Sequence, residues 1–473
     1  MVKHLLKILL TCLIAVWIAY FAVDWKVDGW KKVAERFLAA GQSQTADEMY
    51  RKINNIQPWR ALDWRTLAYM YSRQGQPDKV ISILEPWIQN DRLAVEDVVI
   101  LANAYESTGD SERGRQLLED AGSKAVTGKD LQTIQIERAK FFRADRQFDQ
   151  ALASLRLLQD RGLNTPDSEI DMILLSGVVS PEQLSIEAIQ DSTLPDWVKD
   201  WSQSMKSAAE EPDVSQRWFL IGRRYGVIAE WDLAEYAFTR AVDISPELAD
   251  SWALLAEARQ QQGKSGTEAI TRALELAPDL PTVRLTAALY YRRQHDTKKA
   301  IALLEENIRD NPDGIIWHLE KGNALAEAGR LDDAVLAYQR AVDLYPRDPA
   351  GYRAAARFSI QYGYRLEEVG LEAANSVITL DEDAPDGYDL KGLILSALGK
   401  PQDALAAYQT AVEKDEVYAP VWLHIGQLAL EQADFSAARE ALEKCINLGG
   451  RSYEAQLAGR LLKEYFGEVL PLP

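Results

Sequence analysis

Sulfur and imidazole side chains are scarce in this chain of 473 residues, which contains two cysteines and four histidines. Cys12 lies in an apolar segment and Cys445 occupies a helix-packing position, where cysteine behaves as a small hydrophobic residue, so a disulfide between them is not expected. The histidines are widely spaced, at His4, His295, His318 and His424. Because none has the spacing to Cys, Asp or Glu that zinc ligands need, the sequence indicates no metal site and no cofactor.

Basic residues are also few. The 53 Lys and Arg residues are outnumbered by 72 Asp and Glu, which gives a formal net charge of −19 and a sequence pI near 4.8. Non-specific nucleic-acid binding needs a basic surface that displaces counterions, so nucleic acid is not an expected partner. Docking of the folded region on anionic lipid is disfavoured for the same reason. The acidic balance is typical of a solvated surface, and it also suits a basic protein partner.

Catalytic motifs are missing from the sequence. The chain has no P-loop, no G-x-S-x-G and no H-E-x-x-H. Carboxylate pairs such as Glu305-Glu306 and Asp332-Asp333 fall on expected helix surfaces or helix starts, where they solvate the surface or interact favourably with the helix dipole. We therefore expect a binding protein and not an enzyme.

The chain does have a period of 34 residues, which runs from about Asp28 to Leu448. The repeats that can be placed begin near Val27, Ala61, Val95, Gln132, Ser215, Ala249, Pro281, Ile315, Pro349, Pro385 and Ala419. A chain of this length is not expected to have one hydrophobic core, whereas stacked units have no such size limit. The period therefore predicts supersecondary units that each pack on their neighbours.

Each repeat contains two stretches of helical periodicity, with apolar residues three and four positions apart. Glycines separate the two stretches in most repeats, at Gly41, Gly75, Gly109, Gly263, Gly329, Gly363 and Gly399. Prolines follow the second stretch, at Pro58, Pro246, Pro278, Pro312 and Pro346. Glycine fits the left-handed backbone that ends a helix, and proline cannot continue one. Each repeat is therefore expected to be a pair of helices joined by a tight turn.

The eighth position of every repeat is a small residue. These residues are Ala34, Ala68, Ala102, Ala139, Gly222, Ala256, Ala288, Gly322, Ala356, Gly392 and Gly426. Two antiparallel helices can approach backbone to backbone only where side chains are tiny. Large side chains nearby are expected to fill the remaining space, among them Trp252, Tyr338, Tyr408 and Phe238.

The pattern W-x2-L-G-x2-Y, followed by A-x3-F-x2-A-x4-P, resembles the tetratricopeptide repeat. It is clearest at Trp218, Ile221, Gly222, Tyr225, Ala234, Phe238, Ala241 and Pro246. The resemblance extends over residues 27–452 apart from one gap, and it implies an all-α, right-handed solenoid of helix-turn-helix units. The fourth repeat departs from the pattern, with Arg138 at an apolar position, and the ninth, from Pro349 to Asp383, is irregular.

One apolar segment precedes the repeats. Leu5 to Val23 is interrupted only by Lys7, and at about 1.5 Å rise per residue it just spans a hydrocarbon core of about 30 Å. We interpret it as an uncleaved transmembrane helix. A cleaved signal peptide is the alternative, but no A-x-A site follows. A buried helix of a soluble domain would normally show a polar face, which this segment lacks.

The orientation of this anchor is set by the cations that flank it. Lys3 and Lys7 favour a cytoplasmic N-terminus and repeats outside the cytoplasm. Cations on the other flank favour the opposite, and these are Lys26, Lys31, Lys32 and Arg36. A short cationic start is typical of signal-anchors, so we expect a single-pass protein of a bacterial inner membrane with extracytoplasmic repeats.

The repeat pattern fails between about Pro166 and Pro212, where short helical pieces are expected at Ile170 to Val179 and Asp196 to Ala209. The stretch is either two degenerate repeats that still pack or a hinge. Arg451 to Phe466 is expected to form an amphipathic cap, which a solenoid needs. The predicted organisation is an anchor at 1–26, a first array at 27–165, degenerate repeats or a hinge at 166–214, a second array at 215–452, and a capping helix with a tail at 453–473.

The resemblance also implies a concave face lined by the first helix of each repeat. One strip on the expected face, which we call the cation strip, consists of four arginines and one asparagine: Arg292, Arg293, Asn323, Arg353 and Arg357. It is similar to part of the carboxylate clamp of chaperone-binding tetratricopeptide-repeat domains, and it could hold a carboxylate or phosphate bidentately. The alternative is a solvated surface in which these residues pair with acids such as Glu327 and Glu368. A weaker candidate site consists of Arg65, Tyr69, Arg73, Asn103, Lys140 and Arg143.

These features predict a membrane-anchored scaffold that binds protein partners along its concave groove, either as peptide segments or as subunits of a membrane complex. It would support assembly of a membrane or envelope complex. Two alternatives stay open: a soluble periplasmic or secreted adaptor released by cleavage, and a non-catalytic regulatory subunit of a glycan-transfer or polysaccharide machine. The sequence does not indicate an oligomeric state.

Overall fold

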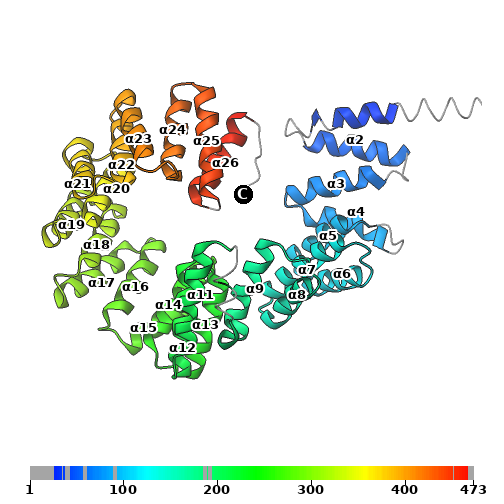
Figure 1. Ribbon diagram of the computed structural model, residues 1–473, viewed down its shortest axis with the longest axis horizontal. Coiled ribbons are helices and arrows are strands. Elements are labelled where there is room, and N and C mark those ends of the chain that lie inside the picture. The colour runs from blue at the N-terminus through cyan, green and yellow to red at the C-terminus, as the bar shows by residue number, and fades with distance from the viewer. Residues whose placement is uncertain are drawn as a thin grey trace, which may run out of the picture. The chain divides into compact units, whose positions relative to one another are not determined.

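A computed structural model describes residues 26–34, 36–37, 43–56, 61–88, 93–184, 189, 194–450 and 452–466. All regular secondary structure in these residues is helical, and they contain no strand (Figure 1). The chain divides into two compact units, which we name unit 1 (Met1–Pro212) and unit 2 (Asp213–Pro473). The predicted all-α fold of paired helices is confirmed.

The expected membrane anchor at residues 5–23 lies outside the described residues, as do Gly41 and Pro58. Within the ranges given above, no helix combines the length and the apolar character needed to cross a bilayer.

Unit 1 begins with residues 26–34, which are helical. Its further elements are α2 (Ser43–Ile56), α3 (Ala61–Arg73), α4 (Pro77–Ile88), α5 (Val95–Ser107), α6 (Ser111–Ser123), α7 (Gly128–Ala144), α8 (Phe148–Asp160), α9 (Pro166–Val179), the 3-10 helix η1 (Pro181–Gln183) and α11 (Asp196–Ala209). The first helices α3 and α5 begin at the predicted residues. Helix α7 begins earlier than the predicted Gln132, because Thr127 and Asp130 form a capping box at its start.

The helical pieces predicted in the gap are present as α9 and α11. Helix α9 packs on α8, so helix packing continues past the end of the clear repeats at residue 165. Helix α11 starts at the predicted Asp196, directly after Pro195.

Unit 2 contains the most regular repeats. Its elements are α12 (Val214–Val227), α13 (Trp231–Ile244), α14 (Ala249–Gln261), α15 (Thr267–Leu276), α16 (Pro281–Arg293), α17 (Thr297–Asp310), α18 (Ile315–Glu327), α19 (Leu331–Leu344), α20 (Pro349–Tyr362), the π-helix η2 (Leu366–Leu371), α21 (Glu372–Leu380), α22 (Pro385–Ala397), α23 (Pro401–Lys414), α24 (Ala419–Glu431), α25 (Phe435–Gly449) and α26 (Tyr453–Phe466). Every first helix starts within one residue of its predicted position.

The first helices of unit 2 contact one another as well as their own partners. Contacts join α14 to α16, α16 to α18, α18 to α20, α20 to α22, α22 to α24 and α24 to the capping helix α26. Figure 1 shows α16, α18, α20 and α22 on the inner side of the arc that these repeats form, with α15, α17, α19 and α21 outside them. We call the surface formed by α16, α18, α20, α22, α24 and α26 the inner face.

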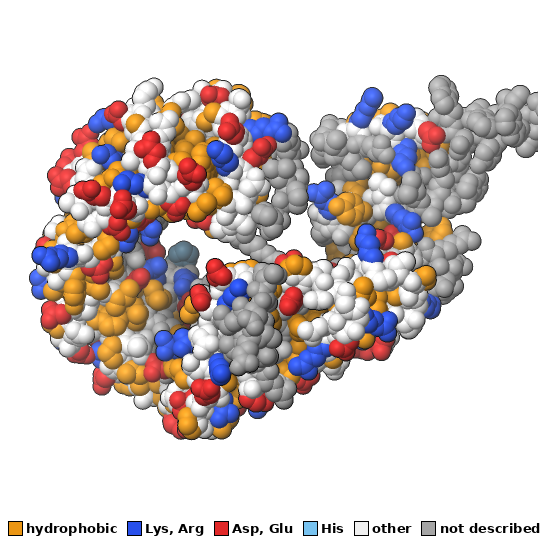
Figure 2. All heavy atoms as spheres, viewed as in Figure 1, with side chains coloured by type: hydrophobic (Ala, Val, Ile, Leu, Met, Phe, Trp, Pro, Cys, Tyr) orange, Lys and Arg blue, Asp and Glu red, His pale blue; other side chains and the backbone are white. Residues whose placement is uncertain are grey.

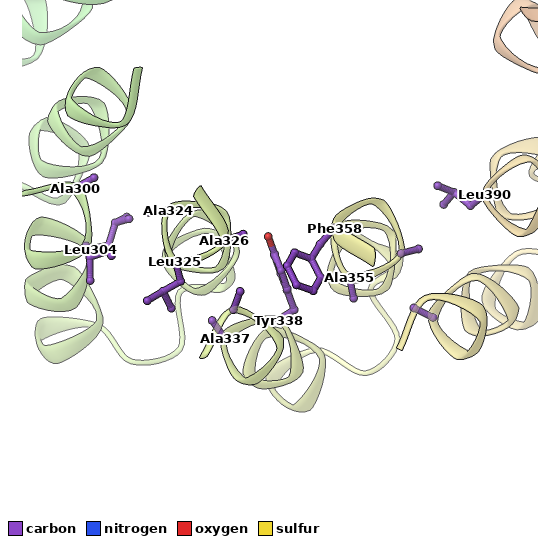
Figure 3. Close-up of a cluster of buried hydrophobic side chains, with 14 of the residues drawn as sticks. Ala300, Leu304, Ala324, Leu325, Ala326, Ala337, Tyr338, Ala355, Phe358 and Leu390 are labelled. Atoms are coloured by element: carbon purple, nitrogen blue, oxygen red, sulfur yellow. The ribbon is translucent and has the colours of Figure 1, made fainter. Parts of the chain in front are cut away.

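The small eighth position is the point of closest approach in each repeat, and all of these residues are buried. In four repeats of unit 2 the residue is glycine, and a methyl group on it would collide with a side chain of the second helix. A Cβ on Gly222 would lie 2.6 Å from the ring of Phe238, and one on Gly322 would lie 2.6 Å from the ring of Tyr338. Figure 3 shows the Tyr338 ring held between α18 and α20, beside Phe358.

Large and small residues are matched across this contact. The partner in the second helix lies sixteen positions after the small residue. Glycine faces an aromatic ring in the pairs Gly222–Phe238, Gly322–Tyr338 and Gly392–Tyr408. Where the small residue is alanine, leucine commonly stands sixteen positions on, as in Ala68–Leu84, Ala102–Leu118 and Ala288–Leu304, and each of these pairs shares one hydrophobic cluster. Glycine with leucine and alanine with tyrosine also occur, in Gly426–Leu442 and Ala34–Tyr50, so the shared feature is a small residue against a larger one.

The turn inside each repeat from α3 onward uses a left-handed residue. Gly75, Gly329 and Gly399 have φ values of 64°, 75° and 72°. Four repeats reach the same conformation without glycine, at Arg146, Ala229, His295 and Ala433, whose φ values are 59°, 60°, 60° and 58°. The turn geometry is thus imposed by the helix pair, and glycine only lowers its cost.

A side-chain hydrogen bond stabilises the turn between repeats, and the sequence analysis did not predict this bond. The fourth residue of a first helix hydrogen-bonds a backbone carbonyl six positions earlier. These bonds join Trp252 to Pro246, Arg284 to Pro278, His318 to Pro312, Tyr352 to Pro346, Tyr388 to Glu382 and Trp422 to Glu416. Because a carbonyl only accepts, the His318 ring must carry its proton on Nε2.

The irregular ninth repeat is explained by its length. Two residues more than the usual period separate the starts of α20 and α22. The extra length is taken up by the π-helix η2, which follows a left-handed Arg365 with φ of 44°. Its Gly370 packs against Ser359 of α20, where a Cβ would lie 2.8 Å from the Ser359 Cβ.

Replacing Gly222 by alanine is expected to lower the free energy of unfolding by about 1–3 kcal/mol, the usual cost of overpacking a core. The control is Gly226 on the same helix, where a Cβ would make an ordinary contact at 3.5 Å from Trp231. Gly226→Ala should be neutral or stabilise by up to about 1 kcal/mol. Urea unfolding followed by circular dichroism measures both, and equal effects would contradict the close approach.

Candidate functional site

The predicted cation strip divides into separate groups of ion pairs on the inner face. In the first group, Arg292 of α16 pairs with Glu320 and Glu327 of α18, the second pair at 3.1 Å. Asn323 donates from Nδ2 to Glu320 at 3.2 Å and accepts from the Tyr338 hydroxyl at 2.7 Å. Arg292 and Asn323 are thus brought together, but by a carboxylate of the protein that already occupies them.

The electrostatics of this group depend on Glu327. Desolvation by burial raises the pKa of its carboxyl above the ordinary value, and the charge of Glu320 raises it further, while Arg292 and His295 act in the opposite direction. Two carboxylates therefore share one guanidinium, and the group carries no spare positive charge.

Arg293 lies on the same helix but faces the preceding repeat. It pairs with Glu257 of α14, and its Nη1 donates to Gln260 Oε1 at 3.0 Å. Neither Glu257 nor Gln260 touches the group around Glu320. Arg293 is therefore not part of one site with Asn323.

The remaining two arginines belong to α20. Arg353 forms a bidentate pair with Asp386 of α22, with the second hydrogen bond at 3.2 Å. This hydrogen bonding raises the pKa of the Arg353 guanidinium. Arg357 is exposed and forms no ion pair within the part of the chain that the structure describes. It is the one member of the predicted strip with an uncompensated charge among the described residues.

Arg357 lines a cleft of about 480 Å³ on the inner face. We call it the α20–α26 cleft, because four helices contribute to it. Its lining consists of Arg357, Ile360, Gln361, Asp386, Asp389, Leu390, Leu393, Tyr418, Pro420, His424 and Glu454. The residues come from the inner surface of three successive repeats and the cap, so the cleft exists only because these units stack.

His424 and Asp389 are a part of this cleft that the sequence analysis missed. The Nδ1 of His424 lies 2.7 Å from Asp389 Oδ1, and the Asp389 side chain is almost fully buried. The His424 ring also lies 6.1 Å from that of Tyr408. The two residues are about one repeat apart in the sequence, and that spacing was the available signal.

Tyr418 completes the polar wall of the cleft. Burial raises the pKa of its hydroxyl, and the nearby carboxylates of Asp389 and Asp386 raise it further, while Arg357 lowers it. A phenol so placed stays protonated and can donate a hydrogen bond.

The weaker candidate site in unit 1 is dispersed. Arg65 pairs with Asp97 at 2.6 Å, and Lys140 pairs with Glu137 of its own helix at 2.7 Å. Arg73 stacks over the exposed Tyr69 ring, 5.9 Å from its centroid. The other two residues are Asn103, which is exposed, and Arg143, which is partly buried. These contacts do not join the six residues into one binding constellation, and the site stays a prediction.

Comparison with known protein families identifies the repeat. A family model described as tetratricopeptide repeat matches residues 285–349 and 390–448, which cover α16 to α19 and α22 to α25. The chain contains tetratricopeptide repeats. The predicted resemblance to the tetratricopeptide repeat is confirmed.

Two curated relatives share part of this array. The chain is 34% identical over 166 residues to a cytochrome c-type biogenesis protein CycH of Rhizobium meliloti, covering 33% of this chain and 42% of the relative. It is 25% identical over 181 residues to Hsp70-Hsp90 organizing protein 2 of Arabidopsis thaliana, covering 37% of this chain and 31% of the relative. The chain thus spans less than half the length of each. Among solved structures, yeast Tom70 is 14% identical, with a TM-score of 0.45, over 93% of this chain and 96% of Tom70.

The raised pKa of Glu327 predicts how the stability of the protein depends on pH. Because its pKa is raised, the folded state favours its protonated form, so its contribution to stability is fully present below the unfolded pKa and is lost as pH rises through the folded pKa. Glu327→Gln should therefore gain stability relative to the wild type as pH rises from about 5 to 7, by less than about 1 kcal/mol after solvent screening.

Asp213 is the control with the opposite sign. The Ser215 hydroxyl and the Gln216 N–H lower the pKa of its carboxyl. Its contribution is present above the unfolded pKa and is lost as pH falls through the folded pKa. Asp213→Asn should therefore lose stability relative to the wild type as pH rises from about 2 to 5, and the difference should be constant above that. Urea midpoints measured from about pH 2 to 7 for the three proteins test both signs, because the Asp213 effect lies below and the Glu327 effect above about pH 5. Parallel curves for the two variants would contradict the assignment.

Proposed function

We propose that this protein is a membrane-anchored scaffold that holds a segment of a partner protein in the α20–α26 cleft. The observation that supports this most is the cleft itself, which opens on the inner face and combines an aliphatic surface with polar groups. Apolar walls supply affinity, and a few fixed polar groups supply orientation and specificity.

The surroundings of the cleft suit a protein partner more than a small molecule. Over unit 2, Lys and Arg side chains are interspersed with Asp and Glu (Figure 2). Many of these charges are paired between successive repeats, as in Arg353–Asp386 and Arg293–Glu257. Such pairing keeps the face rigid and shallow, and a polypeptide can gain affinity from many small contacts along it.

The anchor is the second part of the proposal. Residues 5–23 have the length and composition of a transmembrane helix, and the helix at residues 26–34 follows almost at once. Attachment so close to the first repeat would raise the local concentration of membrane partners. The similarity to a cytochrome c-type biogenesis protein of a bacterium supports a role in assembling a membrane or envelope complex. The cationic start of the chain, with Lys3 and Lys7, favours repeats outside the cytoplasm.

An anion held by the cation strip remains a separate hypothesis. For Arg292 or Arg353 to bind a carboxylate or phosphate, the ligand would have to displace Glu320, Glu327 or Asp386. Displacing a bidentate carboxylate with another gives little net free energy, since the ligand replaces a bond of the same kind.

Crosslinking in native membranes tests the proposed function. We expect purification in mild detergent to recover a stoichiometric membrane partner together with a chain of the full 53.1 kDa mass. A chain shortened by roughly 22 residues, the length of a signal peptide, with no membrane partner would contradict the proposal and favour the soluble adaptor. A variant with Leu10 and Ile14 replaced by lysine should lose the membrane fraction and serves as the control for anchoring.

A further inference from the structure

The charge of the α20–α26 cleft is opposite to that expected from the cation strip. Its lining contains three carboxylates, Asp386, Asp389 and Glu454, but Arg357 is the only arginine or lysine among these residues. Arg353 compensates Asp386 from outside the lining, and His424 shares a hydrogen bond with Asp389. With histidine counted as neutral, the three carboxylates and the two guanidiniums of Arg353 and Arg357 leave a formal charge of −1 (2 − 3 = −1).

The acidic groups of the cleft lie in the same lining as an aliphatic surface. Glu454 begins α26 and forms no ion pair with another described residue. Tyr418 lies beside it in the lining, and the carboxylates of Asp389 and Asp386 act on its hydroxyl. The lining also contains Leu390, Leu393 and Pro420, which form an aliphatic surface. A long side chain with an apolar stem and a charged end fits these surroundings, because its methylenes can cover the aliphatic surface while its charge meets the acids.

We propose that the α20–α26 cleft binds a lysine or arginine side chain, flanked by aliphatic residues, from a segment of a partner protein. This inference rests on the proposed function and adds the chemistry of the partner. The formal charge of −19 for the whole chain acts in the same direction, since it favours encounter with a basic segment. Arg357 then limits the affinity, because it repels the incoming cation.

The probe for this proposal is a fluorescein-labelled peptide of alternating leucine and lysine, five residues long, with blocked ends. Its matched counterpart has glutamate in place of lysine. Fluorescence anisotropy with the full chain in mild detergent should show saturable binding of the lysine peptide and none of the glutamate peptide. Binding should weaken as sodium chloride is raised, since salt screens partly exposed charges.

Four variants separate the cleft from general acidity. Glu454→Gln should weaken binding of the lysine peptide about fivefold, the effect of about one exposed charge interaction, whereas Glu464→Gln, on the same helix but outside the cleft, should leave it unchanged. Arg357→Gln should strengthen binding about fivefold by removing repulsion. Arg340→Gln, on the exposed surface of α19, is its control. Circular dichroism establishes that each variant is folded.

Several outcomes would overturn the inference. These are preference for the glutamate peptide, weaker lysine-peptide binding by Arg357→Gln, and equal effects of Glu454→Gln and Glu464→Gln. A further outcome is that a chain truncated after Phe466 binds the lysine peptide and the full chain does not. The C-terminal tail of the full chain would then be the occupant of the cleft, in place of a partner. The proposed function can fail independently of this inference. A crosslinked membrane partner, together with no preference for the lysine peptide over the glutamate peptide, rejects this inference alone. Binding of the lysine peptide without any membrane partner rejects the scaffold.

Discussion

The rest of the structure depends on one contact, in which the two helices of a repeat meet at its small eighth position. Each such contact brings an alanine or glycine against a larger residue of the second helix, as Gly392 does with Tyr408. Because a small buried residue stands at this contact in every repeat, the two helices can approach closely in each of them. Their first helices can then contact one another, and the inner face with its cleft follows from that stacking.

Charges on the inner face are organised by the same period. A residue on one first helix lies opposite the equivalent position of the next, so a cation and an acid about one repeat apart become neighbours. Arg353 with Asp386 and His424 with Asp389 are both formed in this way. The protein thereby neutralises most of its inner arginines itself. Among the described residues of the cleft, Arg357, Asp389 and Glu454 have no ion pair with Lys, Arg, Asp or Glu, and their summed charge is what a partner meets.

The sequence predicted the repeats well because each helix pair is specified locally. Starts of first helices, the buried small residues and the left-handed glycine turns follow from periodicity and backbone stereochemistry. The π-helix η2 and the left-handed turns at Ala229 and His295 did not follow, since neighbouring helices impose them. The candidate site was harder to predict from the sequence than the helices and turns. The positions of Arg292 and Asn323 within their repeats predict that both lie on the inner face. These positions cannot show that Glu320 bonds to both side chains.

Site-directed photo-crosslinking tests most directly whether the inner face holds the partner. A photoreactive amino acid would replace Gln361, which lines the cleft, or Gln339, which is exposed on the outer helix α19. After irradiation of native membranes, Gln361 is predicted to give a specific adduct with a partner protein, and Gln339 none. Adducts from Gln339 alone, or the same adducts from both positions, would contradict a partner held on the inner face.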